Sequence, residues 1–356
     1  MDFHDLDEEK KKATLELSFS ELGRCIKTTS GMCGDIYVFD QGECVVPRYV
    51  CAKIPKPVSA TDATEINKRF VNELRHQLKW SEHTFVHWAF DFKEIMNTPL
   101  ALFRYWDGDL DSAIDSGELD EMHKLSIMSY ICSGLSHCYN NGLICHQDLK
   151  PANIFIRDMA NQYSELPSLR IYKLPLVADF GLANASFDSG VYAGTRPYMA
   201  PEQWEKSPLS SKTDVFALGV ILYELMSDGF HPVGIKLRDF WPTPLEGNSN
   251  KWTGSRPWKK WSVRDNEKIN GANSRLKDSG VINLVNKMLS QNPEDRPSIN
   301  EVLVTLLQII RSKCEKCYVQ VEFLIKYFNS EVSGEQLNIR WPDLLRRWEL
   351  FSNEFG

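Results

Sequence analysis

The sequence predicts an α+β protein of two lobes, and three observations carry this prediction. The chain has 356 residues, which suggests about two domains at roughly 150 residues each. Its first third reads mainly as strands, whereas the remainder follows the periodicity of helices. Strands and helices that are segregated along the chain are typical of α+β folds. We place the junction of the two lobes near residues 105–108, Tyr-Trp-Asp-Gly.

Composition and charge exclude several classes of protein. Hydrophobic residues make up 42% of the chain and charged residues 25%, as in globular domains. The longest mostly apolar run, residues 215–226, is shorter than the about 20 residues of a membrane span, and the acidic N-terminus lacks the apolar core of a signal peptide. The net charge of −7 argues against nucleic-acid binding through charge alone. The nine cysteines, an odd number without regular spacing, are expected as reduced thiols of a cytoplasmic or nuclear protein.

The first third is expected to begin with a polar tail or fraying helix over residues 1–18, followed by strands. Residues 34–40 and 44–54 flank the turn Gln41–Glu43 and predict a hairpin. Because Pro47 cannot donate to a strand ladder, the start of the second strand is expected to be bulged or at an edge.

A helix follows, for which Ser59 or Thr61 can serve as the N-cap. Strand-like sequence over residues 85–105 completes the first lobe. An apolar i, i+4 stripe marks the buried face of the helix. This stripe consists of Ile66, Phe70, Leu74 and Leu78.

The rest of the chain is expected to be helical. Residues 230–270 stand apart because they are rich in Pro, Gly, Asn and Trp, and residues 314–356 read as a helical extension. On that extension, Phe323, Leu324, Tyr327 and Phe328 are expected on one side. The predicted helices cover residues 121–141, 212–226, 278–291 and 299–313.

Three motifs carry the strongest functional signal. His146–Asn153 resembles the catalytic loop H-R-D-L-x-x-x-N of eukaryotic-type protein kinases, Asp179–Gly181 matches the D-F-G motif, and Ala200–Glu202 matches A-P-E. All three occur in the family's order, with Lys53 and Glu73 upstream, so chance agreement is very improbable. The resemblance covers roughly residues 20–312.

The resemblance implies the bilobal protein-kinase fold. A small β-rich N-lobe with one main helix would cover about residues 19–105, and a larger helical C-lobe about 106–312. Residues 1–18 would form an N-terminal tail, and residues 313–356 a helical C-terminal extension.

The resemblance also implies roles for the catalytic residues. Asp148 would accept the proton of the substrate hydroxyl, and Lys150 would reach the transferred phosphate, because phosphoryl transfer depends on positioning and charge neutralisation. Asn153 and Asp179 would supply oxygen ligands to Mg²⁺, or to Mn²⁺ in its place. The family's nucleotide is ATP.

Lys53 would bind the α- and β-phosphates, held in place by a glutamate of the predicted helix. Glu73 lies one turn after Phe70 of the apolar stripe and is expected on the same side, with Glu65 as the alternative.

The glycine-rich loop departs from the family pattern G-x-G-x-x-G-x-V, because Thr29 replaces the first glycine and only Gly31 and Gly34 remain. Cys33 and Cys51 are expected as ordinary small side chains, with a redox-sensing thiol as the alternative. By alignment with the family, Phe103 would be the gatekeeper, the backbone of Arg104 and Trp106 would meet the adenine edge, and Phe155 would lie beneath it. The complete set expected to bind ATP is Thr28, Gly31, Gly34, Ile36, Cys51, Lys53, Phe103, Arg104, Trp106 and Phe155.

Residues 148–151, Asp-Leu-Lys-Pro, resemble serine/threonine kinases rather than tyrosine kinases. Thr195 would contact Asp148 and Lys150 and shape the acceptor site, unless it is a phosphorylation site or a plain loop residue. Three further residues would have structural roles in the scaffold. These are Asp214, which would brace the catalytic loop, and Glu202 and Arg296, which would pair with each other.

Three departures from the family pattern stand out. Gln147 replaces the arginine before Asp148, Gln77 occupies an aliphatic position, and residues 157–172 read as an insertion in a hairpin. Because neutral Gln147 cannot pair with a phosphate, activity is expected not to require phosphorylation at Ser186, Ser189, Tyr192 or Thr195. Another basic residue, Arg157, Arg196 or Lys173, could instead take the place of the arginine.

Two weaker signals carry their own alternatives. Cys314 and Cys317 have a zinc-like spacing without a second ligand pair, so an exposed helical pair is expected. The Trp-rich segment 230–270 is expected to serve structural packing, with protein docking and then nucleic-acid binding as alternatives.

The function that the resemblance implies is ATP-dependent phosphorylation of Ser and Thr hydroxyls on protein substrates. Residues 230–270 and 313–356 are possible docking sites for other proteins, with no membrane partner expected. Two alternatives remain open, a pseudokinase that acts as a scaffold and a small-molecule kinase of the aminoglycoside or choline type.

Overall fold

The described part of the chain forms two compact units, which we treat separately: residues 3–80 with 87–106, and residues 83–86 with 108–329. Both helices and antiparallel strands are present, which confirms the predicted α+β class. No helix in the described residues is long and apolar enough to cross a bilayer. The computed structural model describes residues 3–30, 34–45, 47–56, 63–80, 83–106, 108–160, 166–264, 269 and 274–329.

The first unit is built on a five-stranded antiparallel sheet with the strand order β1-β2-β3-β5-β4. The predicted hairpin is confirmed, since β2 pairs with β3 from Asp35↔Ile54 to Asp40↔Tyr49. The second strand is shorter than expected and begins only after Pro47. The expectation of a bulged or edge start is wrong, because β3 lies between β2 and β5 with regular pairing, and Pro47 stays outside the strand, where no ladder N–H is needed. The strands are β1 Arg24–Ser30, β2 Asp35–Asp40, β3 Tyr49–Ile54, β4 Ala89–Ile95 and β5 Thr98–Arg104.

Alternate residues of these strands point to opposite faces of the sheet. One face packs against helix α2 (Ala63–Trp80), as the predicted stripe indicates, through Phe70, Leu74 and Leu78. Position 66 of the stripe is not part of this buried cluster. The proposed caps Ser59 and Thr61 lie outside the described residues.

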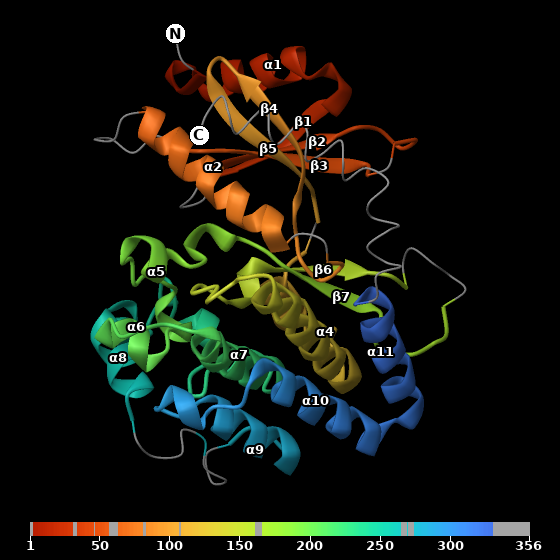
Figure 1. Ribbon diagram of the computed structural model, residues 1–356, viewed down its shortest axis with the longest axis vertical. Coiled ribbons are helices and arrows are strands. Elements are labelled where there is room, and N and C mark those ends of the chain that lie inside the picture. Colours follow the sequence, from red (N-terminus) through yellow and green to blue (C-terminus); the bar gives the residue numbers. More distant parts are fainter. Residues whose placement is uncertain are drawn as a thin grey trace. The chain divides into compact units, whose positions relative to one another are not determined.

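The other face of the sheet is covered by the N-terminal segment, which the sequence had predicted as a tail or fraying helix. Helix α1 (Glu8–Ser18) begins at Asp7, whose side chain accepts a hydrogen bond from the Lys10 N–H. Phe3 and Leu15 are buried against Tyr37 and Phe39 of β2. The expectation of a tail is therefore wrong for residues 3–18, because burial of these apolar side chains ties the segment to the sheet. Figure 1 shows α1 and α2 on opposite sides of the strands.

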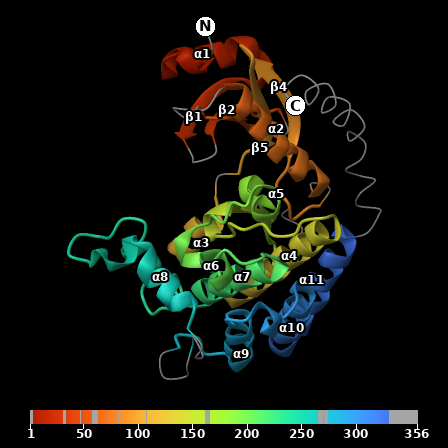
Figure 2. The same ribbon diagram turned by 60° about the vertical axis from the view of Figure 1, so that its left-hand side comes forward.

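The second unit is mainly helical and contains the two-stranded sheet β6–β7, which follows α4 in the chain. Helix α7 is buried on nearly all sides from Thr213 to Leu225, so it lies in the core of this unit. Helix α8 lies at one side of the unit, away from α10 and α11 (Figure 2). The elements are α3 Leu110–Ser116, α4 Glu121–Asn140, β6 Ile154–Asp158, β7 Lys173–Val177, α5 Ala185–Ser189, α6 Pro201–Glu205, α7 Ser211–Met226, α8 Ser255–Ser262, α9 Ser279–Met288, α10 Ile299–Lys313 and α11 Glu315–Phe328.

The buried face of α11 is formed by residues other than the four that were expected on one side of the helix. Cys317, Val321 and Ile325 are buried, whereas Phe323 is 57% exposed and Tyr327 is 38% exposed. The aromatic residues are therefore mostly on the solvent side, although Phe328 packs edge-on against Phe85. Residues 330–356 of the predicted extension lie outside the described residues.

The Trp-rich segment supports the packing interpretation. Trp252, Trp258 and Trp261 are each at most 8% exposed. The centroids of the Trp258 and Trp261 rings lie 5.1 and 4.5 Å from the centroid of the His231 ring. Burial lowers the pKa of His231 to about 3, so its ring is neutral inside this aromatic cluster. These indoles are not available to stack on nucleic-acid bases.

Cys314 and Cys317 are joined in a disulfide with their Cα atoms 5.3 Å apart. This corrects two expectations, that all cysteines are reduced and that the pair is exposed, since Cys317 is 4% exposed. Cys314 is the N-cap of α11 and Cys317 lies in its first turn, which brings the two sulfurs together.

Candidate active site

The first unit places Lys53 against a single glutamate. Lys53 lies on β3, two residues after Cys51 and on the face that α2 covers. Its Nζ is 2.5 Å from Glu73 Oε1, and the two side chains are only 12% and 15% exposed. Glu65, the alternative, pairs with Arg69 at 3.2 Å and is 53% exposed. The structure therefore brings Glu73, and not Glu65, to Lys53.

The strands on either side of the glycine-rich turn are tied together. Ser30 Oγ at the end of β1 donates to Asp35 Oδ1 at the start of β2, at 2.7 Å. A Cβ atom at Gly34 would lie 2.5 Å from the Ile54 carbonyl oxygen, so close backbone packing alone requires glycine there. In the same sheet Thr28 pairs with Tyr37 and Ile36 with Lys53. Gly31 and Cys33 lie outside the described residues.

The end of β5 is held by the buried residue His87. The ring of His87 stacks on Phe103 at 5.3 Å, and its Nε2–H donates to the Arg104 carbonyl oxygen at 2.9 Å. Burial lowers the pKa of His87 to about 4, so the imidazole is neutral and keeps this donor. The Arg104 guanidinium lies 4.4 Å from the Trp106 ring.

The structure explains the environments of Gln77 and Cys51 in this unit. Gln77 is buried and donates from Nε2 to the His87 carbonyl oxygen at 3.0 Å, so its polar group is satisfied in a core position. Cys51 is 7% exposed, and burial raises the pKa of its thiol to about 12. Since the thiolate is the reactive form, the redox-sensing interpretation is not supported for Cys51.

In the second unit, Asp214 of α7 braces the backbone of the catalytic loop. Its two carboxylate oxygens accept the N–H groups of His146 at 2.7 Å and Gln147 at 3.0 Å. The hydroxyl of Tyr139 donates to the same carboxylate at 2.8 Å. Burial raises the pKa of Asp214, which is 1% exposed, and these donors oppose that effect by favouring the ionised form.

Asp148 lies at the centre of a cluster that joins the catalytic loop to residues 179–202. This stretch, from the D-F-G to the A-P-E motif, is called the activation segment. The Thr195 N–H donates to Asp148 Oδ1 at 2.7 Å, and Lys150 Nζ donates to Oδ2 at 3.0 Å. Lys150 Nζ also donates to Thr195 Oγ1 at 3.0 Å. The structure thus brings together the three residues that the sequence assigned to the acceptor site.

Asn153 and Asp179 come together through the β6–β7 hairpin. Asn153 precedes β6, Asp179 follows β7, and the Ala178 N–H donates to the Asn153 carbonyl oxygen at 2.9 Å. Asn153 Nδ2 donates to the Asp148 carbonyl oxygen at 2.9 Å, so its amide oxygen is the atom offered to a ligand. Phe155 lies on β6 opposite Leu176.

An amide oxygen and a carboxylate fit a hard cation such as Mg²⁺. Within the described residues no group of three or more His, Cys, Asp or Glu side chains could hold a metal ion alone. The two side chains would therefore hold the ion only together with phosphate oxygens and water, as is usual for Mg²⁺ beside a nucleotide.

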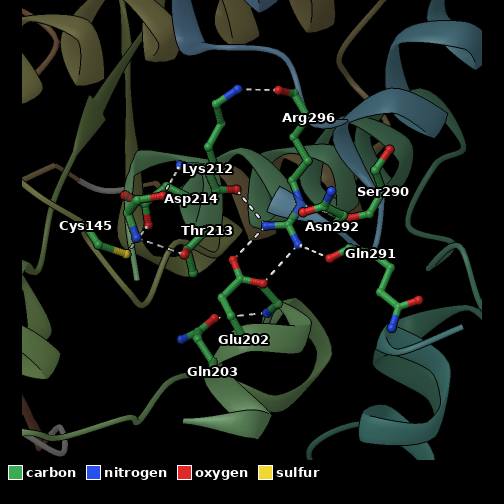
Figure 3. Close-up of polar contacts among 12 residues, drawn as sticks. Cys145, Glu202, Gln203, Lys212, Thr213, Asp214, Ser290, Gln291, Asn292 and Arg296 are labelled. Carbon is green, nitrogen blue, oxygen red and sulfur yellow. Dashed lines mark hydrogen bonds and ion pairs between the residues drawn. The ribbon is translucent and has the colours of Figure 1, made fainter. Parts of the chain in front are cut away.

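Glu202 and Arg296 form a fully buried bidentate ion pair, as predicted (Figure 3). The Arg296 guanidinium donates to the two Glu202 carboxylate oxygens at 2.7 and 2.9 Å. Its other N–H groups donate to the carbonyl oxygens of Ser290, Lys212 and Gln291 at 2.8 to 2.9 Å. All five donors of the guanidinium are thus used.

Sequence reasoning missed two residues of this region, Gln203 and Glu224. Gln203 lies directly after the A-P-E motif, and its amide bridges the catalytic loop and the activation segment. Glu224 lies on α7, 3% exposed, and accepts the Tyr198 hydroxyl at 2.8 Å. The available signal for Glu224 in the sequence is a glutamate inside the mostly apolar run of residues 215–226.

Glu224 predicts a specific pH dependence of stability. Burial, aided by Asp111 and Asp115, raises its pKa from 4.5 to about 8. A raised folded-state pKa means that the folded state retains a proton which the unfolded state has already lost above pH 4.5. Stability is therefore expected to fall between pH 4.5 and 8, by up to about 1.4 kcal/mol per pH unit from this group.

Glu224→Gln should flatten this decline, since the amide cannot ionise but can still accept from Tyr198. Denaturant unfolding across this pH range measures it, with the exposed Glu246→Gln as the matched control. Identical pH profiles for the wild type and Glu224→Gln would contradict the prediction.

Comparison with known proteins shows the family. Residues 43–306 match the model of the protein kinase domain, and the chain belongs to this family. This match confirms the resemblance inferred from the three motifs.

Relatives from distant organisms agree. The chain is 31% identical over 194 residues to serine/threonine-protein kinase pkn3 of Myxococcus xanthus, which covers 54% of the chain and 32% of that protein. It is also 31% identical over 198 residues to the interferon-induced, double-stranded RNA-activated protein kinase of Mus musculus, which covers 54% of the chain and 31% of that protein. The matches thus span about a third of the length of these curated relatives.

Proposed function

We propose that the chain is an ATP-dependent protein kinase that transfers the γ-phosphate of ATP to Ser and Thr hydroxyls of proteins. The observation that carries this proposal is the Asp148–Lys150–Thr195 cluster, in which a carboxylate and an ammonium group are held 3.0 Å apart at a loop braced by Asp214. The formed Lys53–Glu73 pair supports it, because in protein kinases this ion pair must be in place for activity.

The chemistry follows from the residues present. Asp148 accepts the proton of the acceptor hydroxyl, while Lys150 stabilises negative charge that develops during transfer. Lys53 would bind the α- and β-phosphates, and Asn153 and Asp179 would hold the cation. Mg²⁺ held there would supply positive charge that neutralises the phosphates. Mn²⁺ is the alternative, since it also prefers oxygen ligands.

A pseudokinase is disfavoured by this geometry. The altered positions Gln77 and Gln147 are both hydrogen-bonded: Gln77 donates to the His87 carbonyl oxygen, and Gln147 bonds to the backbone of Val191 and Ser186. A small-molecule kinase is disfavoured by the buried Glu202–Arg296 pair, which anchors an activation segment of the protein-kinase type.

The test is a phosphate-transfer assay with three acceptors: one peptide carrying Ser, Thr or Tyr at the same position, a casein-like protein, and small alcohols such as choline. We expect labelling of the protein and of the Ser and Thr peptides. The Tyr peptide should remain unlabelled, because Lys150 and Thr195 shape a shallow site beside Asp148. Asp148→Asn protein serves as the control for contaminating kinases.

Phosphoamino-acid analysis of the product decides the outcome. Chiefly phosphotyrosine would contradict the Ser/Thr assignment. Labelling of the alcohols alone would indicate a small-molecule kinase, and no labelling of any acceptor would favour the pseudokinase.

A further inference from the structure

Gln147, which replaces the arginine of the family motif, is bonded to the backbone of the activation segment. Its Nε2 donates to the Val191 carbonyl oxygen at 2.6 Å and to that of Ala193 at 3.2 Å. Its Oε1 accepts the Ser186 N–H at 3.2 Å. The residue is 4% exposed, so these bonds form away from water.

A second buried amide completes this arrangement. Gln203 Nε2 donates to the carbonyl oxygens of Gln147 at 2.9 Å and Ala193 at 3.0 Å. Its Oε1 accepts the Ala200 N–H at 3.0 Å. The backbone at Gly194 runs so close that a Cβ atom there would lie 2.9 Å from both the Gln147 oxygen and Gln203 Nε2.

The two amides act where the segment meets the acceptor site. Ala193, which both of them contact, lies two residues before Thr195, whose N–H donates to Asp148. Neutral amides match this backbone, because each offers both donors and an acceptor. An arginine at position 147 would offer hydrogen-bond donors but no acceptor. Its positive charge would need an anionic partner, and a phosphate group usually provides that partner.

Two basic residues that could replace the missing arginine have other partners. Lys173 is paired with Asp158 at 3.0 Å. Arg196 donates to the Thr253 carbonyl oxygen and lies 5.5 Å from the Trp241 ring. Two of the three candidate substitutes for the missing arginine are therefore engaged elsewhere.

We propose that Gln147 and Gln203 are positioning residues which hold Thr195 against Asp148 in the unphosphorylated chain, so that the acceptor site forms without a phosphate on the activation segment. This inference rests on the proposed kinase function for its activity readout. It goes beyond that function by naming what orders the segment.

The first experiment needs no variant. The protein is treated with a non-specific phosphatase until its intact mass shows no phosphate, and amide exchange is then measured over residues 185–200. We expect the N–H groups of Ser186, Thr195 and Ala200 to be protected. Exchange of this segment at the rate of an unstructured peptide would overturn the inference, whatever the enzymatic activity.

The second experiment compares Gln147→Met, which keeps the length of the side chain without its hydrogen bonds, with Gln308→Met on the exposed side of α10. Dephosphorylated wild type should retain its initial rate on a Ser peptide. Gln147→Met should lose roughly tenfold or more in kcat/KM for the peptide, with KM for ATP unchanged. Gln203→Met should show the same pattern, whereas Gln308→Met should match the wild type.

The outcomes separate the two proposals. A wild type that transfers no phosphate at all, but protects the segment, would contradict the kinase function and leave the positioning role supported. An active wild type whose rate falls tenfold or more on dephosphorylation and returns on rephosphorylation would overturn the inference alone. Gln147→Met with wild-type kinetics and protection would also overturn it.

Discussion

Replacement of Asp148 by asparagine is expected to lower kcat by roughly 10²–10⁴-fold, the usual contribution of a positioned acid or base. Asparagine can still accept the Thr195 N–H, so the loop should keep its shape, but the amide cannot take the proton of the acceptor hydroxyl. Binding of ATP should be nearly unchanged, since Lys53 and Asp179 remain. Steady-state phosphorylation of a Ser peptide and equilibrium binding of ATP measure the two effects separately.

Asp228→Asn is a matched control, because this aspartate is 74% exposed and pairs with Lys124 on the surface. It should leave both quantities unchanged. Retention of more than a few per cent of activity by Asp148→Asn, with ATP binding intact, would exclude Asp148 as the base. Loss of ATP binding would indicate that the substitution disturbs the fold of the loop instead.

The second large effect concerns stability rather than chemistry. Arg296→Met is expected to destabilise the protein by about 3–5 kcal/mol, because it leaves the Glu202 carboxylate buried without its partner. The side chains of this pair are 0% and 5% exposed, so water cannot compensate. Three backbone carbonyl oxygens that Arg296 now satisfies would also lose a donor. Denaturant unfolding at constant pH measures the change.

Arg238→Met provides the comparison with an exposed ion pair. Arg238 is 53% exposed and lies 3.0 Å from Asp115, so its loss should cost less than about 1 kcal/mol. Combining Arg296→Met with Glu202→Met should recover part of the lost stability, since no unpaired charge then remains buried. Equal destabilisation by the two arginine variants would refute the importance of burial for this pair.

Local patterns account for the elements that the sequence predicted well. The helix expected over residues 299–313 has those bounds in the structure. Its start is set by a capping box of Ser298 and Glu301, which four consecutive residues of the sequence contain. The β2–β3 hairpin was likewise predictable from a short turn between strand-like runs. The three ordered motifs identified the family.

The sequence by itself therefore determined the fold class, the family and the set of residues that surround Asp148. Only the tertiary structure decided which surfaces these segments meet. It packed Phe3 and Leu15 on the sheet, turned Phe323 of α11 to the solvent, and joined Gln147 to the backbone of residues 186–193. The physical reason is that a helix cap or a turn depends on neighbours along the chain, whereas a buried face or an amide bond to a distant carbonyl depends on groups that only folding brings together.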